Sequence, residues 1–579
     1  MLLPRLRPHS HPATLNSTLG LADRAVPSSA ESNNMTRTTR RPTRGSLQTA
    51  IRIAVLGLAT GCAGQSQALS FQPNEDLKLD WNTTLTYGLA WRTESRDHAL
   101  SNGFPNPAIA NIDDGNNAFD KGSLITNRAS FLTEMNLNWQ QDFGLFMRAS
   151  GFYDEVYNRS NDNGTGTSNC FAGGRCSQPN HFPDDTIDQH GKDIRLLDAY
   201  VYGAWDLGGH NLNLRVGDQV VSWGESLFIG NGISGAMAPV DATKANTPGV
   251  ELKELFLPVG QVFGQIDLTD SLSLQAYYQY KWEKTEIDGV GSFFSITDQM
   301  DEGGFTDAFG ITRRLSDDEP SDSGQYGVAL NYVAESLNNT EFGLYYVRFH
   351  DKAPQLDFLT DWNTANYQVR YFDNIDLYGA SFSTVVGDTN VSGEISYRDG
   401  QPVLVDTGLV PHPVRAETMQ AQVSFIHSFG TLPIADNTTL IGELGYNEVL
   451  DNDRADSFTA FVPDGAGGAF PLNTPNTDKL YFDKSSWGYT LNLSLEYLNI
   501  FNGWDLTVPL IFSQNLGGDS SLPGTFGMGE GDHRLGVGTT WRYLNNLTLE
   551  ARYNAFLGDA GDTPFADRDN VGINAKYSF

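Results

Sequence analysis

The residues best suited to chemistry lie in one Gly- and Pro-rich segment, SWGESLFIGNGISGAMAPVDATKANTPGVELKELFLPVGQ, at positions 222–261. The segment lacks regular alternation, and Pro248 predicts the start of a short helical turn. Long loops with apolar content are usually functional. Folded into a hollow interior, residues 223–257 would form a constriction or plug and line a pathway with seven side chains: Trp223, Glu225, Asp241, Lys244, Glu251, Lys253 and Glu254. The alternative is a cap that only seals or stabilises the fold.

Two cysteines, Cys170 and Cys176, stand close together in the polar stretch TSNCFAGGRCSQPN. Five intervening residues, two of them Gly, allow the ring between the cysteines to close, so we expect a disulfide in an oxidising compartment. The alternative is a metal site, which two thiols without a nearby His pair would serve poorly.

Motifs of enzymes and cofactor sites are missing from the sequence. The ten His include no His-Glu-x-x-His spacing, and His181 and His190 stand in an acidic stretch where we expect them to be solvated. The acidic pairs Asp113 with Asp114, Asp298 with Asp301, and Asp451 with Asp453 have no EF-hand spacing, which favours hydrated loops over Ca²⁺ sites. We therefore predict no enzyme, no cofactor and no metal.

The beginning of the chain has the pattern of an export signal. From Met35, which we expect to be the true start, basic residues precede a short apolar run that begins near Ile53 and ends in small residues. That run is too short to span a bilayer, so we predict that 1–70 is an upstream extension plus a Sec signal peptide cleaved near residue 70. The net charge of −32 argues against a nucleic-acid partner.

The elements that must hold these residues are strands. In LKLDWNTTLTYGLAW, at 77–91, apolar and polar residues alternate for long enough to cross a membrane obliquely. Comparable segments predict about 18 strands (16–18). They begin near 77, 129, 143, 194, 211, 258, 271, 324, 340, 367, 389, 414, 437, 485, 503, 532, 546 and 568.

Short turns alternate with long polar connections along the whole chain, as periplasmic turns and outer loops do in bacterial barrels. A bilayer cannot hydrogen-bond an open sheet edge, so the first and last strands should pair. We therefore predict an all-β protein, a transmembrane antiparallel β-barrel over 71–579 in the bacterial outer membrane, with a lumen-folded or capping loop. Tyr577 and the terminal Phe579 resemble the signal that the barrel-assembly machinery reads.

Four runs carry a resemblance to a known family: RVGDQVVSWGESLFIGNGI, PVDATKANTPGVELKELFLP, LSLQAYYQYKWEKTEIDGVGSFFS and IDLYGASFSTVVGDTNVSGEISYRDGQPV. They resemble the proteobacterial outer-membrane family catalogued as domain of unknown function 1302. The resemblance implies transport of hydrophobic or lipid-like molecules. The partners it implies are an inner-membrane exporter of the resistance-nodulation-division type and a lipoprotein-like periplasmic protein.

Three functions remain open from the sequence. The first is a barrel that passes or exports a hydrophobic or lipid-like compound with envelope partners. The second is a porin for small hydrophilic solutes, which the polar inward faces of the strands favour. The third is a structural or adhesin-like barrel, whose outer loops would contact other surfaces. In every case we expect contact with the outer membrane and its lipopolysaccharide.

Overall fold

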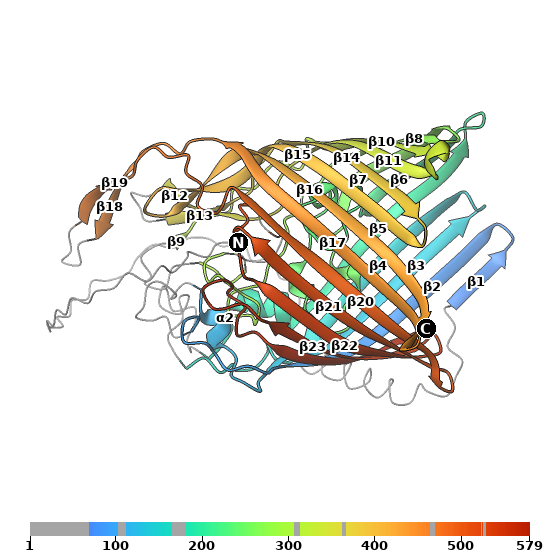
Figure 1. Ribbon diagram of the computed structural model, residues 1–579, viewed down its shortest axis with the longest axis horizontal. Helices are drawn as coiled ribbons and strands as arrows, with labels where there is room; N and C mark the ends of the chain where they lie inside the picture. The colour runs from blue at the N-terminus through green and yellow to red at the C-terminus, as the bar shows by residue number, and fades with distance from the viewer. Residues whose placement is uncertain are drawn as a thin grey trace, which may run out of the picture. The chain divides into compact units, whose positions relative to one another are not determined.

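Eighteen antiparallel strands close into a barrel in the computed structural model (Figure 1). The structure describes residues 69–101, 112–164, 180–300, 302–305, 313–361, 366–463, 469–522, 524 and 529–579. The barrel strands are β2 (Leu77–Arg92), β3 (Leu124–Trp139), β4 (Phe143–Asp154), β5 (Lys192–Asp206), β6 (Asn211–Gln219), β7 (Val259–Thr269), β8 (Leu272–Gln279), β10 (Gln325–Ala334), β11 (Thr340–Phe349), β14 (Ile375–Val386), β15 (Thr389–Asp406), β16 (Pro411–Leu432), β17 (Ala435–Asn452), β20 (Ser485–Phe501), β21 (Trp504–Gly517), β22 (His533–Tyr543), β23 (Leu547–Phe556) and β24 (Asn570–Ser578).

Closure joins the two ends of the described chain. β2 pairs with β24 in a register that runs from Thr84 opposite Ser578 to Arg92 opposite Asn570. Strand β1 (Leu69–Asn74) adds to β2 beyond the point where β24 ends. Because every one of the 18 barrel strands has a partner on both sides, the barrel wall itself has no open edge among the described residues. The predicted fold class is confirmed.

The remaining elements are small and lie in the connections. They are α2 (Asp114–Asn117), α4 (Asp184–Thr186), η1 (Ile187–Gly191), η2 (Ile233–Ala236), η3 (Ala242–Lys244), η4 (Leu252–Glu254), η5 (Glu335–Leu337), a sheet of β9 (Arg313–Arg314), β12 (Gln355–Asp361) and β13 (Asn366–Arg370), and a hairpin of β18 (Thr459–Pro463) and β19 (Ala469–Asn473). Within the described residues, no helix is long and apolar enough to cross a membrane.

Alternation along β2 sets which side chains face the bilayer. Leu85, Tyr87 and Leu89 are partly exposed on the outer face, whereas Thr84 and Thr86 are buried on the inner face. The same pattern on other strands leaves large apolar side chains exposed around the barrel. Since lipid replaces water at this surface, an apolar exterior is the stable arrangement.

Connection lengths differ between the two ends of the barrel (Figure 1). Short turns such as 140–142 and 387–388 join strands at the end where β24 finishes, whereas connections such as 155–191 and 453–484 lie at the other end. The predicted alternation of short and long connections is therefore present in the structure.

One predicted strand position was wrong. The tenth barrel strand is β14, which begins at Ile375, whereas position 367 belongs to β13. β13 alternates as a barrel strand would, with Tyr367 and Val369 fully buried, but it pairs with β12 and β9. A period of two shows that a segment is a strand and leaves open which sheet it joins.

Candidate functional site

A loop of 39 residues, 220–258, connects β6 to β7 and lies inside the barrel. Its first part packs against the inner wall: Trp223, Ile233 and Met237 form one buried apolar cluster with Tyr277 of β8 and Leu377 of β14. The indole Nε1 of Trp223 donates a hydrogen bond of 2.7 Å to Gln275. Inner faces that are polar elsewhere are apolar here, because the loop rather than water covers them.

Two wall carboxylates hold the middle of this loop by its backbone. Glu443 of β17 accepts hydrogen bonds from the amides of Leu227 (3.0 Å), Phe228 (2.6 Å) and Ile229 (2.7 Å). Glu394 of β15 accepts hydrogen bonds from the amides of Glu225 (2.5 Å) and Ile233 (2.9 Å). Hydrogen bonds from an amide to a carboxylate are stronger than neutral ones. The loop is thereby fastened to the wall opposite its own strands.

A wall cation completes this attachment. Arg398 of β15 donates to the carbonyl oxygens of Asn231 (2.6 Å) and Gly232 (2.8 Å) and to the Asn231 side chain. Glu394, Glu443 and Arg398 were missed at the sequence level. They stand on the polar faces of predicted strands, where nothing in the sequence separates a side chain that binds a loop from one that faces water.

The second part of the loop approaches the strands at which the barrel closes. A Cβ atom at Gly88 of β2 would lie 3.0 Å from the carbonyl oxygen of Pro248, and one at Gly572 of β24 would lie 3.0 Å from the Pro248 ring. Only glycine permits this close approach. Lys253 then reaches Glu134 of β3, with 2.5 Å between Nζ and Oε2. The loop therefore touches β15, β17, β24, β2 and β3 and crosses the lumen.

The seven predicted pathway residues fall into two groups. Five are paired or packed within the loop and its walls. Trp223 belongs to the apolar cluster, and the Glu225 amide donates a hydrogen bond to Glu394. Asp241 and Lys244 form a buried ion pair of 3.2 Å, and the Glu254 side chain accepts a hydrogen bond of 3.0 Å from the Glu251 amide. Glu251 and Lys253 form an ion pair of 3.1 Å and remain about one third exposed. The pathway-lining role of all seven stays a prediction.

The helical turn predicted at Pro248 was misplaced. Pro248 and Gly249 form a turn, and the helical turn η4 begins at Leu252, after Glu251. Gly249 has a φ of +81°, which no right-handed helix tolerates.

Three cavities adjoin the loop. A cavity of about 760 Å³ lies between its start and the inner faces of β3–β8 at the short-turn end, which we call the vestibule. One of about 410 Å³ separates residues 244–255 from β21–β24, with Glu550, Arg552 and Lys576 among its walls. One of about 470 Å³ lies beside Arg148. Leu252 borders the second and third and is 69% exposed.

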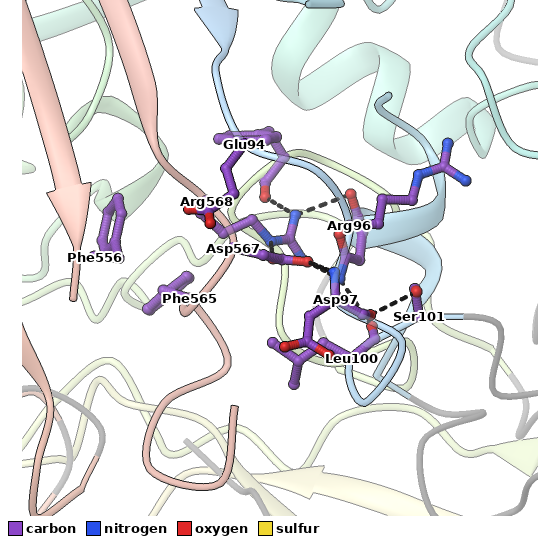
Figure 2. A network of polar contacts seen from close by, with 12 residues as sticks. Glu94, Arg96, Asp97, Leu100, Ser101, Phe556, Phe565, Asp567 and Arg568 are labelled. Carbon is purple, nitrogen blue, oxygen red and sulfur yellow. Dashed lines mark hydrogen bonds and ion pairs between the residues drawn. The ribbon is translucent and has the colours of Figure 1, made fainter. Parts of the chain in front are cut away.

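The long connections form a polar network near the end of β2, and Figure 2 shows part of it around Asp97, Asp567 and Arg568. The Arg92 guanidinium is fully buried and forms an ion pair of 2.8 Å with Asp567. Asp567 also accepts hydrogen bonds from the Asp97 amide (2.6 Å) and from Asn116 (2.7 Å). The connections after β2 and before β24, distant in sequence, are thus joined where the barrel closes.

The expectation that His190 is solvated was wrong. His190 is 4% exposed, lies against the ring of Tyr157 with 4.9 Å between centroids, and accepts a hydrogen bond of 3.0 Å from the Gly289 amide. Burial, with the nearby Arg128 cation, lowers the pKa of His190 to about 3. His190 is therefore a neutral packing residue.

The expectation of hydrated acidic loops failed at one place. Asp113, Asp114 and Asp298 are buried, and their carboxylates lie within 4.8 Å of one another. Asp298 Oδ2 accepts the Asp113 amide at 3.1 Å. Asp451 and Asp453 are exposed as expected. The sequence could not show that Asp298 lies beside Asp113 and Asp114 in the folded protein.

Several predictions concern the ends and one outer connection. Residues 1–68, which include most of the predicted signal segment, and the pair Cys170 and Cys176 lie outside the described residues. Tyr577 pairs with Leu85, and the Phe579 amide donates to the Thr83 carbonyl at 3.0 Å, so both terminal aromatics belong to the closing seam. Their role as an assembly signal stays a prediction.

Closed antiparallel strands, an apolar exterior and a loop across the lumen define a porin-like barrel of the outer-membrane type. More specifically, the chain belongs to the family described as protein of unknown function (DUF1302), whose model matches residues 49–579. The family predicted from the sequence is confirmed. No curated protein matches the chain significantly in sequence.

Solved structures with a similar fold include several bacterial barrels. Acinetobacter baumannii OccAB4 shares 12% identity at a TM-score of 0.41, covering 88% of this chain and 100% of that one. Pseudomonas aeruginosa OccK2 (OpdF) in complex with glucuronate shares 11% at 0.37, covering 86% and 98%. Salmonella typhi OmpF in complex with daunomycin shares 10% at 0.34, covering 88% and 100%.

Proposed function

We propose that the protein is an outer-membrane channel for small solutes and that loop 220–258 sets its aperture. The observation that carries this proposal is the attachment of the loop to the far wall, through Glu394 and Glu443 of β15 and β17. A loop that served only as an outer cap would have no need of anchors on inward-facing positions of opposite strands.

The remaining open space has walls suited to polar solutes. The cavity between the loop and β21–β24 is lined by Glu550, Arg552 and Lys576 together with Asn and Thr side chains. Charges of both signs on the neighbouring strands β23 and β24 can orient a dipolar or charged solute and keep water in the passage. This supports the porin function.

The test is single-channel conductance of the refolded full chain in planar bilayers, before and after residues 224–256 are replaced by a short Gly-Ser linker. The expected result is a small or absent current in the parent and a large, steady current in the deletion variant. Equal currents in the two proteins would refute the loop's role. No current in either would refute the channel.

A milder change addresses the anchors without shortening the chain. Glu394→Gln combined with Glu443→Gln removes both anchoring charges, and the expected result is noisy, larger currents as the loop detaches. The matched control is Glu496→Gln, because Glu496 also lies on a barrel strand but accepts from Asn437 rather than from the loop. Currents from the control should equal those of the parent.

A second candidate function, export of a hydrophobic or lipid-like compound, is favoured by Leu252. This side chain is 69% exposed between two cavities, and Val220 and Phe256 line the cavity beside it. An exposed apolar side chain beside two cavities offers a contact surface to an apolar cargo. Leu252→Asn should lower the transfer of an amphipathic dye between liposome compartments and leave ion current unchanged. Unchanged dye transfer would refute this role.

The setting of the channel follows from the same proposal. We infer residence in the bacterial outer membrane, after removal of a signal peptide near residue 70, with insertion by the barrel-assembly machinery. The support is the apolar exterior and the terminal aromatics at the seam. A resistance-nodulation-division exporter and a lipoprotein-like protein are proposed as partners on family resemblance. Crosslinking from the turn 140–142 in intact cells tests them, and capture of neither would refute that part.

A further inference from the structure

The vestibule is lined by aromatic side chains as well as polar ones, and a loop that only narrows a channel would not need these aromatic side chains. Its walls are inward positions of β3–β8 and the turn residues Gln141 and Asp142. Val221 and Trp223 of loop 220–258, which we call the lumen loop, close it on the side away from these turns. Its volume of about 760 Å³ is within the range of small-molecule sites. This space lies between the short turns at one end of the barrel and the start of the loop.

Several aromatic side chains stand among the polar side chains of the vestibule wall. Phe146 and Tyr200 lie in contact with 5.4 Å between ring centroids, and Tyr202 is fixed by its hydroxyl, which donates to Asn136 at 2.9 Å. Phe263 and Trp223 add two buried rings. Rings held in place at several strands offer flat faces to a planar or elongated apolar body at little entropic cost.

One cation stands among these rings. The Arg215 guanidinium carbon lies 4.4 Å from the centroid of Phe263 and 5.7 Å from that of Tyr200. In the described part of the chain no carboxylate lies within ion-pair distance of Arg215, whereas Arg148 nearby is paired with Glu134 and Asp198. Arg215 is only partly buried, and beyond its contact with the Tyr200 hydroxyl its guanidinium can donate to a solute.

We propose that the vestibule is a binding subsite for small amphipathic anions, in which Arg215, held over the Phe263 ring, binds the anionic head and Phe146 and Tyr200 contact the apolar body. This inference rests on the proposed channel function and names the class of solute that the channel selects. The planar guanidinium can donate two parallel hydrogen bonds to a carboxylate, sulfate or phosphate monoester. A neutral analogue would leave these donors to water.

Polar side chains at the rim complete the recognition. Gln265 and Asn213 line the vestibule with Arg215 and can donate to the same head group. Asp142, the one acidic side chain of the described lining, belongs to the turn at the mouth, where it disfavours loosely held anions. The subsite therefore selects solutes that carry both a charge and an apolar body.

The experiment is isothermal titration of the refolded full chain in lipid nanodiscs with 2-naphthoate and with its neutral analogue 2-naphthamide. The parent protein should bind 2-naphthoate about tenfold or more tightly than 2-naphthamide, the scale of one charge-assisted pair. Arg215→Gln should remove that preference. The matched control is Arg454→Gln, which removes an exposed arginine paired with Asp478 in the long connection after β17 and should keep the preference.

Equal affinity of the parent for the two probes, or an unchanged preference in Arg215→Gln, would overturn the proposal, as would an equal loss in Arg454→Gln. If Arg215→Gln does not fold, the test uses the parent's preference together with Arg215→Lys. The lysine keeps the charge but cannot donate two parallel hydrogen bonds, so this variant should bind 2-naphthoate more weakly than the parent does. Sugar uptake by liposomes separates the two ideas. Sugar uptake without a preference for 2-naphthoate would refute only the subsite, and absence of sugar uptake would refute the channel.

Discussion

The anchor at Glu443 allows the strongest test of how the lumen loop is held. Its two oxygens accept three backbone amides from consecutive residues, Leu227, Phe228 and Ile229, at 2.6–3.0 Å. Glu443→Gln keeps the shape of the side chain and one acceptor oxygen. It replaces the other oxygen with an NH₂ group, which is a donor that faces donors.

The magnitude follows from these contacts. One amide loses its acceptor, at a cost of about 1.5–3 kcal/mol for a hydrogen bond to a charged group, and two keep an acceptor without charge, at about 1 kcal/mol each. Together these give about 3 kcal/mol or more. The opening equilibrium of the loop segment should therefore rise by about 100-fold or more.

Hydrogen exchange measured by mass spectrometry on the refolded barrel reads this equilibrium directly. Peptides that contain Leu227, Phe228 and Ile229 should exchange about 100-fold faster in Glu443→Gln, while peptides from β24 should be unchanged. The control Glu496→Gln should leave exchange in the loop as it is in the parent. If the three amides stay protected in Glu443→Gln, the carboxylate does not hold the loop, and the reasoning fails.

Two further predictions concern the outer end of the barrel. Asp567→Asn leaves the fully buried Arg92 without its ion-pair partner and should lower the free energy of unfolding by about 3–5 kcal/mol. Asp478→Asn breaks a pair that is more than half exposed and should leave the free energy of unfolding almost unchanged. Similar urea midpoints for the two variants would contradict this. Burial lowers the pKa of Lys352, just beyond β11, to about 7. Between pH 7 and about 10 the unfolded chain holds this proton and the folded chain does not, so stability should rise with pH there, and the rise should be smaller in Lys352→Met. Parallel melting temperatures across that range in parent and variant would refute the assignment.

Most of the barrel could be predicted from the sequence because its cause is local. Alternation such as that at 77–91 places apolar side chains on one face, and a bilayer permits only one arrangement for a series of such strands. The strand at 367 shows the limit. Tyr367 and Val369 alternate just as barrel residues do, yet their partners are β12 and β9, and pairing is decided by contacts between distant segments.

The candidate site divides in the same way. The sequence identified segment 222–261 as the irregular one, because Gly and Pro interrupt its alternation. The anchors Glu394, Glu443 and Arg398 and the vestibule cation Arg215 could not be recognised, since each is one polar residue among many on an inward face.

By itself, then, the sequence determined that strands form, which face of each meets lipid, and where the regular pattern breaks, since all three depend on the types and order of neighbouring residues. Only the tertiary structure decided that the lumen loop crosses to β15 and β17, and that Asp298 lies beside Asp113. It also decided that His190 is buried and uncharged. These features depend on pairs of residues up to about two hundred positions apart, which come together only when the barrel closes.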